Sequence, residues 1–366
     1  MKKTLVALAI LASAGTAFAA GHTAPASSVT LFGILDASMT NVNKNAAGAS
    51  FTGMTTSNVA SSQFGMRGSE NLGGGLRAIF ELTADIDTNN GTFDGTAGNS
   101  MNSGALFRRA SYVGLAGGFG QVTLGRRLNP FILGAAGDQV HNGNSTSTAR
   151  TAAMGFADFW TKNALTYVSP NMGGLTVHAQ YGFSNAAGRS GDGTMMSLVG
   201  VYGQGPLSLT AGYEKLDGGL TAAEVAATSG ISTVVAAPVV GKKEAQYITG
   251  RYAMGPVTIG AGFYQVKGAI AAGSATTSSR DGSTVTVGYT FSKQASASVS
   301  YADYEGTKVG TIQGRYILSP RTSLYALYND IDNGTVTTFV PTWGARANPR
   351  PGARQTALTA GVIHSF

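Results

Sequence analysis

Apolar and polar residues alternate along much of this chain, and a period of two is typical of a β-strand whose two faces meet different surroundings. In the segment 283–291, two valines, a tyrosine and a phenylalanine fall on one face and three threonines on the other. The segment 294–303 repeats the pattern with alanine, valine and tyrosine against three serines. A helical period is almost absent, and the high glycine, serine and threonine content disfavours long helices. We therefore expect an all-β fold.

The connections between the expected strands alternate in length. Seven are short turns rich in glycine, proline and asparagine, at 71–75, 116–118, 169–174, 203–206, 254–256, 291–294 and 318–321. Eight are longer polar stretches, at 41–58, 88–103, 127–159, 185–192, 216–242, 268–280, 305–308 and 331–353. Together they define sixteen strands of about ten residues, the length that a tilted strand needs to cross a bilayer.

An even number of strands, with tight turns at one end and long loops at the other, is the pattern of an outer-membrane barrel. A closed barrel also leaves no unpaired sheet edge in hydrocarbon. A soluble β-sandwich or a secreted β-repeat protein is the alternative, but such a protein buries its apolar faces and has no need of alternating connections. We expect a sixteen-stranded antiparallel transmembrane β-barrel with short periplasmic turns and long extracellular loops.

The first residues, MKKTLVALAILASAGTAFAA, combine a positive start, an apolar core and the small-x-small site Ala17-Phe18-Ala19. This is the pattern of a secretory signal peptide over residues 1–19, with a buried N-terminal helix as the alternative. No later run reaches the roughly 18 apolar residues of a spanning helix. We expect an exported protein whose mature chain, 20–366, forms one barrel domain.

Composition disfavours several classes of function. The chain has no cysteine, so it has no disulfide or thiolate metal site. Its net charge of +7 is spread along the chain, and no basic cluster suggests a nucleic-acid partner. The four histidines lack ligand spacing, and the glycine-rich stretch 114–120 lacks the lysine and the helix of a phosphate-binding loop. We expect no metal, no cofactor and no enzymatic activity.

Five segments resemble the general porins of Gram-negative bacteria, especially the β-proteobacterial type. They are 27–38, 65–82, 106–131, 163–175 and 361–366, of which LFRRASYVGLAGGFGQVTLGRRLNPF at 106–131 is the most specific. The chain also ends in an aromatic residue, as barrels inserted by the outer-membrane assembly machinery do. The resemblance implies a homotrimer of barrels in the outer membrane, in contact with lipid and lipopolysaccharide. Each barrel is then a water-filled pore for small hydrophilic solutes and ions, narrowed by an inward-folded third loop.

The resemblance also implies a constriction with basic residues on one wall and carboxylates of the third loop, here 127–159, on the other. Asp138 is the candidate carboxylate of this loop. Arg109 occupies a position similar to the family's constriction arginine, and Arg67 a position that is often basic. Arg126 and Lys162 are the remaining candidates for the basic wall.

The chain departs from the family's pattern at two of these places. Gln63 stands where relatives commonly have an arginine, and Trp160 stands at a basic position that Lys162 could replace. Opposite charges across a narrow opening create a field that aligns polar solutes. With several basic residues against few carboxylates, we expect a modest preference for anions. The alternative function is a binding or adhesive barrel that acts through the long loops 216–242 and 331–353.

Overall fold

The computed structural model describes residues 27–43, 50–93, 106–135, 137–141, 160–184, 187–188, 190–217, 242–268, 279–304, 307–333 and 352–366. The predicted signal peptide lies outside the described residues, as do most of the long loops. The third loop is described only as far as His141.

Strands make up most of the described chain. They are β1 (Ser28–Asn43), β2 (Phe51–Thr56), β3 (Gln63–Gly73), β4 (Leu76–Asp85), β5 (Ala110–Gly117), β6 (Gly120–Leu128), β7 (Trp160–Val168), β8 (Leu175–Gly182), β9 (Met195–Gln204), β10 (Leu207–Leu216), β11 (Lys243–Met254), β12 (Val257–Gly268), β13 (Arg280–Thr290), β14 (Ala295–Tyr304), β15 (Thr307–Ser319), β16 (Thr322–Asp332) and β17 (Arg354–Ser365). A short helix, α2 (Pro130–Ala135), follows β6. Among the described residues, no helix has the length and apolar character needed to cross a membrane.

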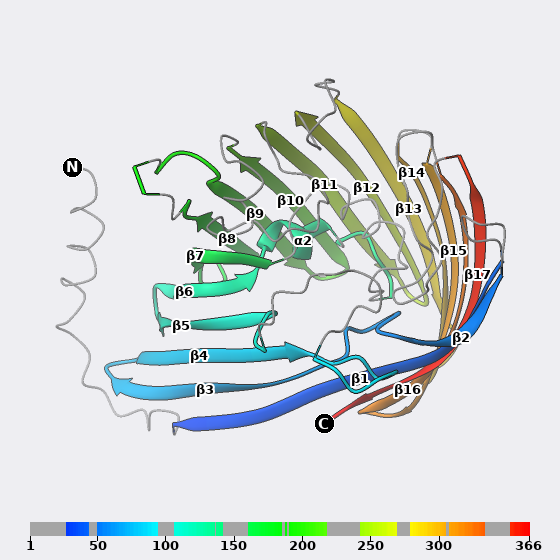
Figure 1. The fold of residues 1–366 in the computed structure, drawn as a ribbon, viewed down its shortest axis with the longest axis horizontal. Helices are drawn as coiled ribbons and strands as arrows, with labels where there is room; N and C mark the ends of the chain where they lie inside the picture. Colours follow the sequence, from blue (N-terminus) through cyan, green and yellow to red (C-terminus); the bar gives the residue numbers. More distant parts are fainter. Residues whose placement is uncertain are drawn as a thin grey trace.

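The strands form one closed antiparallel barrel (Figure 1). From β3 to β17 each strand pairs with the next, and β1 closes the ring by pairing with β3 and with β17. The chain end completes this seam, because the backbones of Gly33 and Phe366 exchange hydrogen bonds of 3.1 and 3.0 Å. Closure leaves no sheet edge exposed to lipid.

The barrel has seventeen strands but sixteen positions around its wall. Both β2 and β3 pair with β1, β2 along 37–42 and β3 along 28–34, so they lie end to end in a single position. The prediction of sixteen positions and of seven short turns is confirmed. The strand β2 was missed, since it falls within the stretch 41–58 that the sequence suggested as a loop.

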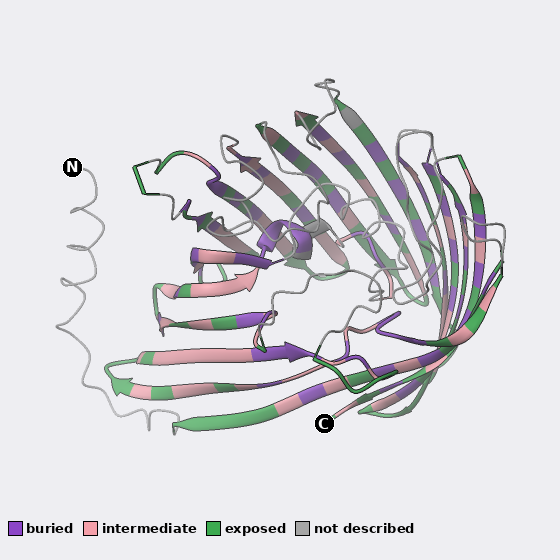
Figure 2. Ribbon diagram, viewed as in Figure 1, coloured by how far each residue is buried: buried purple, intermediate pink, exposed green. Residues whose placement is uncertain are grey.

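The two faces of the wall differ as the alternation predicted, and buried and exposed residues form bands along the strands (Figure 2). On β13, Val285 and Val287 are 45% and 47% exposed, while Thr284 and Thr286 are 5% and 2% exposed. The apolar side chains therefore form the outer surface, and the polar side chains face the interior. This places lipid outside the barrel and polar surroundings within it.

A pair of neighbouring substitutions on β14 tests this assignment of faces. Val299, on the outer face, is 56% exposed, and Ser300 points inward. Because an arginine on the lipid face near the middle of a strand costs about 2–4 kcal/mol, Val299→Arg is expected to lower the free energy of unfolding by that amount. Ser300→Arg serves as the control and is expected to cost much less. Urea unfolding in lipid vesicles measures both, and equal losses would contradict the assignment.

Candidate pore constriction

The third loop folds into the barrel immediately after β6. Helix α2 lies against β8, β9, β10 and β11. Its Phe131 and Ile132 are buried in a cluster with Trp160, Tyr247 and Tyr264, and the rings of Phe131 and Tyr247 meet edge to face with centroids 4.6 Å apart. These aromatic residues lie on the inner face, so the inward fold of the loop is confirmed for its described part.

A buried polar cluster fixes the start of the loop. Asn129 donates a hydrogen bond from its amide to the carboxylate of Glu214 on β10 and accepts one of 2.8 Å from Ser197 on β9. The Nζ of Lys243 lies 3.8 Å from Glu214, whose side chain is 3% exposed. A buried carboxylate is tolerated only when such donors satisfy it. Glu214 therefore ties the loop to three adjacent strands.

Asp138 makes a second attachment, to the next two strands around the wall, β12 and β13. Its carboxylate accepts hydrogen bonds of 2.5 Å from Thr284 and 3.4 Å from Tyr264, and it is fully buried. Burial raises the pKa of Asp138 to about 6, although both hydrogen bonds and the charge of Arg251 oppose the rise. The resemblance implies that this carboxylate faces the open pore. In the structure its carboxylate contacts β12 and β13 and holds the loop against them.

His141 extends the attachment to β14. Its two ring nitrogens lie 2.8 Å from the hydroxyls of Ser298 and Ser296. Burial and the positive charge of Arg315 lower the pKa of His141 below its ordinary value. The lowered pKa favours the uncharged ring, which bridges two serines of the barrel wall.

Two glycines make room for this part of the loop. A Cβ at Gly260 on β12 would lie 1.8 Å from the carbonyl oxygen of Asp138, and a Cβ at Gly288 on β13 would lie 2.2 Å from Val140. Neither distance is compatible with a side chain. The loop can therefore rest directly on the backbone of the wall.

The inner faces of β3 to β6 carry basic residues. Arg67 on β3 is exposed, and its guanidinium lies 5.0 Å from the centre of the Phe32 ring. Arg127 on β6 lies 4.8 Å from the centre of the Tyr112 ring and donates a hydrogen bond of 3.1 Å to Thr123. Stacking on an aromatic ring orients a guanidinium without neutralising its charge.

Arg109 lies just before β5, and its charge is paired with a carboxylate. Both Arg108 and Arg109 pair with Asp85, at 3.0 and 2.7 Å, and all three side chains are largely buried. The guanidinium of Arg109 also stacks on Trp160, at 4.9 Å from the ring centre. The tryptophan at the family's basic position, on β7, thus supports the arginine that precedes β5, on the far side of β6.

The structure places Arg126 and Lys162 less favourably than the sequence suggests. The pairing of β6 with β7 shifts register between Gly125 and Arg127. Arg127 has the parity of the buried Thr123 and contacts the inward-facing Tyr112, whereas Arg126 has the parity of the exposed Leu124 and donates a hydrogen bond to the backbone carbonyl of Arg108. Lys162 is half-buried on β7, and Asn163 follows it with a left-handed φ of 53°.

The role of Arg67, Arg109, Arg126, Lys162 and Asp138 at the constriction stays a prediction. Sequence reasoning did not name Arg127 or Asp85 as site residues, and it placed Glu81 inside the barrel without a role at the constriction. The two carboxylates share the inner parity of β4, so alternation alone indicated their direction. Arg127 shares the parity of the buried Thr123 on β6, so alternation indicated its direction as well.

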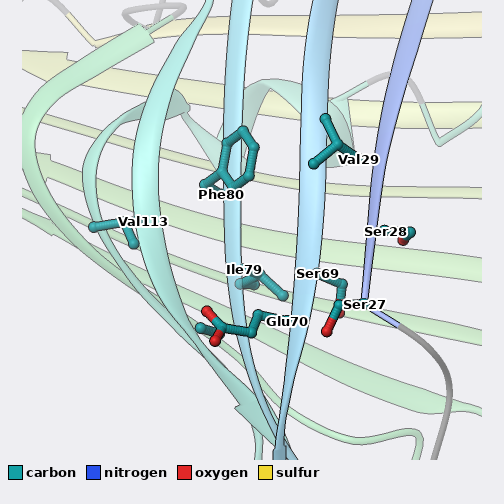
Figure 3. A pocket seen from close by; sticks show the side chains of 9 residues that line it. Ser27, Ser28, Val29, Ser69, Glu70, Ile79, Phe80 and Val113 are labelled. Carbon is teal, nitrogen blue, oxygen red and sulfur yellow. The ribbon is translucent and has the colours of Figure 1, made fainter.

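A separate hollow of about 530 Å³ lies on the wall at the beginning of β1 (Figure 3). It is lined by Ser27, Glu70, Val29, Phe80 and Val113 among others. It includes none of the predicted constriction residues. In the described part of the chain, no group of three or more histidines and carboxylates lies close enough together to hold a metal ion.

A closed barrel with an apolar outer face, short turns and an inward-folded loop defines the class of outer-membrane β-barrels. Residues 4–335 match the sequence family described as Gram-negative porin. The chain therefore belongs to the Gram-negative porin family, as the resemblance predicted, and this membership locates it in the outer membrane.

Individual relatives agree with this membership. The chain is 37% identical over 226 residues to outer membrane porin protein 32 of Delftia acidovorans, covering 58% of this chain and 59% of that protein. It is 30% identical over 252 residues to an outer membrane porin of Bordetella pertussis, covering 59% and 60%. The matches thus span about three fifths of these curated relatives. The solved anion-selective porin from Comamonas acidovorans has a TM-score of 0.69 and 26% identity, over 93% of this chain and 100% of that one. Family and fold point to a channel and not to an enzyme.

The buried salt bridges of Asp85 with Arg108 and Arg109 are expected to contribute strongly to stability. Removing one partner of a buried ion pair costs about 3–5 kcal/mol, because the remaining charge has no partner. Asp85→Asn is therefore expected to lower the free energy of unfolding by that amount. The control is Asp330→Asn, since Asp330 pairs with Arg354, whose side chain is 69% exposed. An exposed pair is worth about 0–1 kcal/mol. Similar losses for the two variants would contradict the assigned burial.

The close approach at Gly260 gives a second test. Gly260→Val is expected to push the loop away from β12, with an overpacking cost of about 1–3 kcal/mol. The chain has no native cysteine, so a single Gln139→Cys reports on the loop. Its labelling by a water-soluble maleimide is expected to speed up with Gly260→Val. Gly314→Val is the control, because a Cβ there has no heavy atom within 4 Å. Unchanged labelling in the Gly260 variant would contradict the contact.

Proposed function

We propose that this protein is a passive diffusion channel of the outer membrane for small hydrophilic solutes and ions, with a modest preference for anions. The closed barrel, its polar inner face and the inward-folded loop support a water-filled and narrowed passage. Members of the family that share these features with it include a solved porin described as anion-selective.

The observation that carries the anion preference is how the charges of the interior are partnered. Five carboxylates on the inner side each accept hydrogen bonds or ion pairs from the protein, namely Asp36, Glu81, Asp85, Asp138 and Glu214. By contrast, within the described part of the chain Arg67, Arg127 and Arg315 form no ion pair with a carboxylate. The interior therefore presents positive charge to a passing ion more than negative charge.

The proposal also covers the oligomeric state of the protein. We propose a homotrimer in contact with outer-membrane lipid and lipopolysaccharide, on the strength of family membership. An adhesin acting through 216–242 and 331–353 is the alternative, and its loops fall mostly outside the described residues. No described contact favours it over a channel.

Reversal potentials across a salt gradient in planar bilayers test the preference. The wild type is expected to favour anions, and Arg67→Glu and Arg127→Glu are each expected to shift the potential toward cations. A unit charge about 6 Å from an ion in water is worth on the order of 0.7 kcal/mol, so a change of two charges alters the energy of that ion by about 1.4 kcal/mol, or roughly tenfold at low salt. Lys293→Glu, in the exposed turn between β13 and β14, is the matched control. A cation-selective wild type, or an equal shift in the control, would refute the proposal.

A further inference from the structure

The chain leaves the barrel wall between β2 and β3. Pairing of β2 with β1 ends at Thr56 and Ala37, and pairing of β3 with β1 begins at Gln63 and Ile34. Six residues, 57–62, therefore stand opposite only two residues of β1. Such an excess cannot remain in the plane of the sheet. We call this segment, residues 57–62, the inner turn.

The inner turn projects toward the interior. Its Val59 is buried in a cluster with Tyr325 and Leu327 of β16 and Ile363 of β17. These three belong to the inner face, because Leu324 and Val362, which have the opposite parity, are 43% and 40% exposed. The inner turn therefore crosses the inner surface of β1, β17 and β16.

Asp36 of β1 holds the inner turn at both its tip and its ends. Its carboxylate accepts hydrogen bonds from the backbone N–H groups of Val59 and Ala60, at 2.7 and 2.8 Å. The same carboxylate accepts a hydrogen bond of 2.6 Å from the hydroxyl of Tyr325. The backbone carbonyl of Asp36 accepts hydrogen bonds from Ser57 N at 3.0 Å and from Ser62 Oγ at 3.1 Å. One fully buried residue thus fixes the conformation of the whole segment.

The inner turn and the third loop occupy different parts of the interior. The described part of the third loop lies along β8 to β14, from the contacts of α2 to those of His141. The wall between the two elements carries Arg67 and Arg127 on one side, and Arg315 of β15 on the other. The inner turn itself, with the sequence SNVASS, has no charged residue.

We propose that the inner turn is a second narrowing element of the pore, separate from the third loop, with Asp36 as its positioning residue. Ala60 and Ser61 are its half-exposed residues and form its surface toward the lumen. Because the segment is uncharged, it limits the size of solutes and leaves the sign of the ion preference to the arginines. This inference rests on the proposed channel function.

Changes at the anchor test the role of Asp36. Asp36→Ala leaves the two backbone N–H groups and the Tyr325 hydroxyl without their acceptor, so the inner turn is expected to lose its fixed position. Single-channel conductance is expected to rise, and vesicle swelling is expected to speed up more for larger neutral sugars than for smaller ones. Tyr325→Phe is the control, since it removes one hydrogen bond and keeps both backbone attachments. A folded Asp36→Ala protein with wild-type conductance and wild-type size dependence would overturn the proposal.

A cysteine in the inner turn gives a test that leaves the anchor intact. Ser61→Cys provides the single thiol of the chain, and its modification by a bulky methanethiosulfonate is expected to reduce the current of each channel in a discrete step. Lys293→Cys in the turn between β13 and β14 is expected to be modified without loss of current. Modification at residue 61 with no change in current would overturn the inner turn's role. If the wild type forms no channels at all, the proposed function fails instead, and the two failures are distinguishable.

Discussion

Closure of the backbone hydrogen bonds around the barrel is the constraint on which the rest of this structure depends. An apolar outer face can lie in hydrocarbon only if no strand edge is left unpaired. Here β1 meets this demand by pairing with β17 along one side and with β2 and β3 along the other. Once the wall is closed, every polar face is directed inward, and the interior becomes the place where function can be specified.

Inside the wall, buried carboxylates act as attachment points. Glu214 holds the beginning of the third loop, Asp138 holds its next part, and Asp36 holds the inner turn. Hydrogen bonds strengthen where the surroundings have a low dielectric constant, and an unpartnered carboxylate there is costly. Each carboxylate therefore has its hydrogen-bonding capacity taken up by the segment that it holds in place. Arg67 and Arg127, which stack on aromatic rings and form no ion pair with a described carboxylate, keep their charge.

The alternation of the sequence was enough to predict the barrel, its turns and the direction of residues on regular strands. It placed Arg67 on the inner face because β3 is regular there. On β6 it assigns Arg127 to the side of the buried Thr123 and Arg126 to the side of the exposed Leu124, so Arg126 was a candidate by resemblance and not by alternation. It also gave no sign that Asp36 or Asp138 would be buried, since their partners Tyr325 and Thr284 lie far away in the chain. Local patterns record which face a residue occupies, while long-range contacts decide whether its charge remains available.

The central claim is that a water-filled lumen exposes more positive than negative charge to passing ions. Single-channel conductance of the wild type in different salts tests it most directly, with potassium paired to a small or a bulky anion and chloride paired to a small or a bulky cation. We expect discrete channels whose conductance falls more when the anion is made bulky than when the cation is. A larger fall on changing the cation, or the absence of discrete channels, would contradict it.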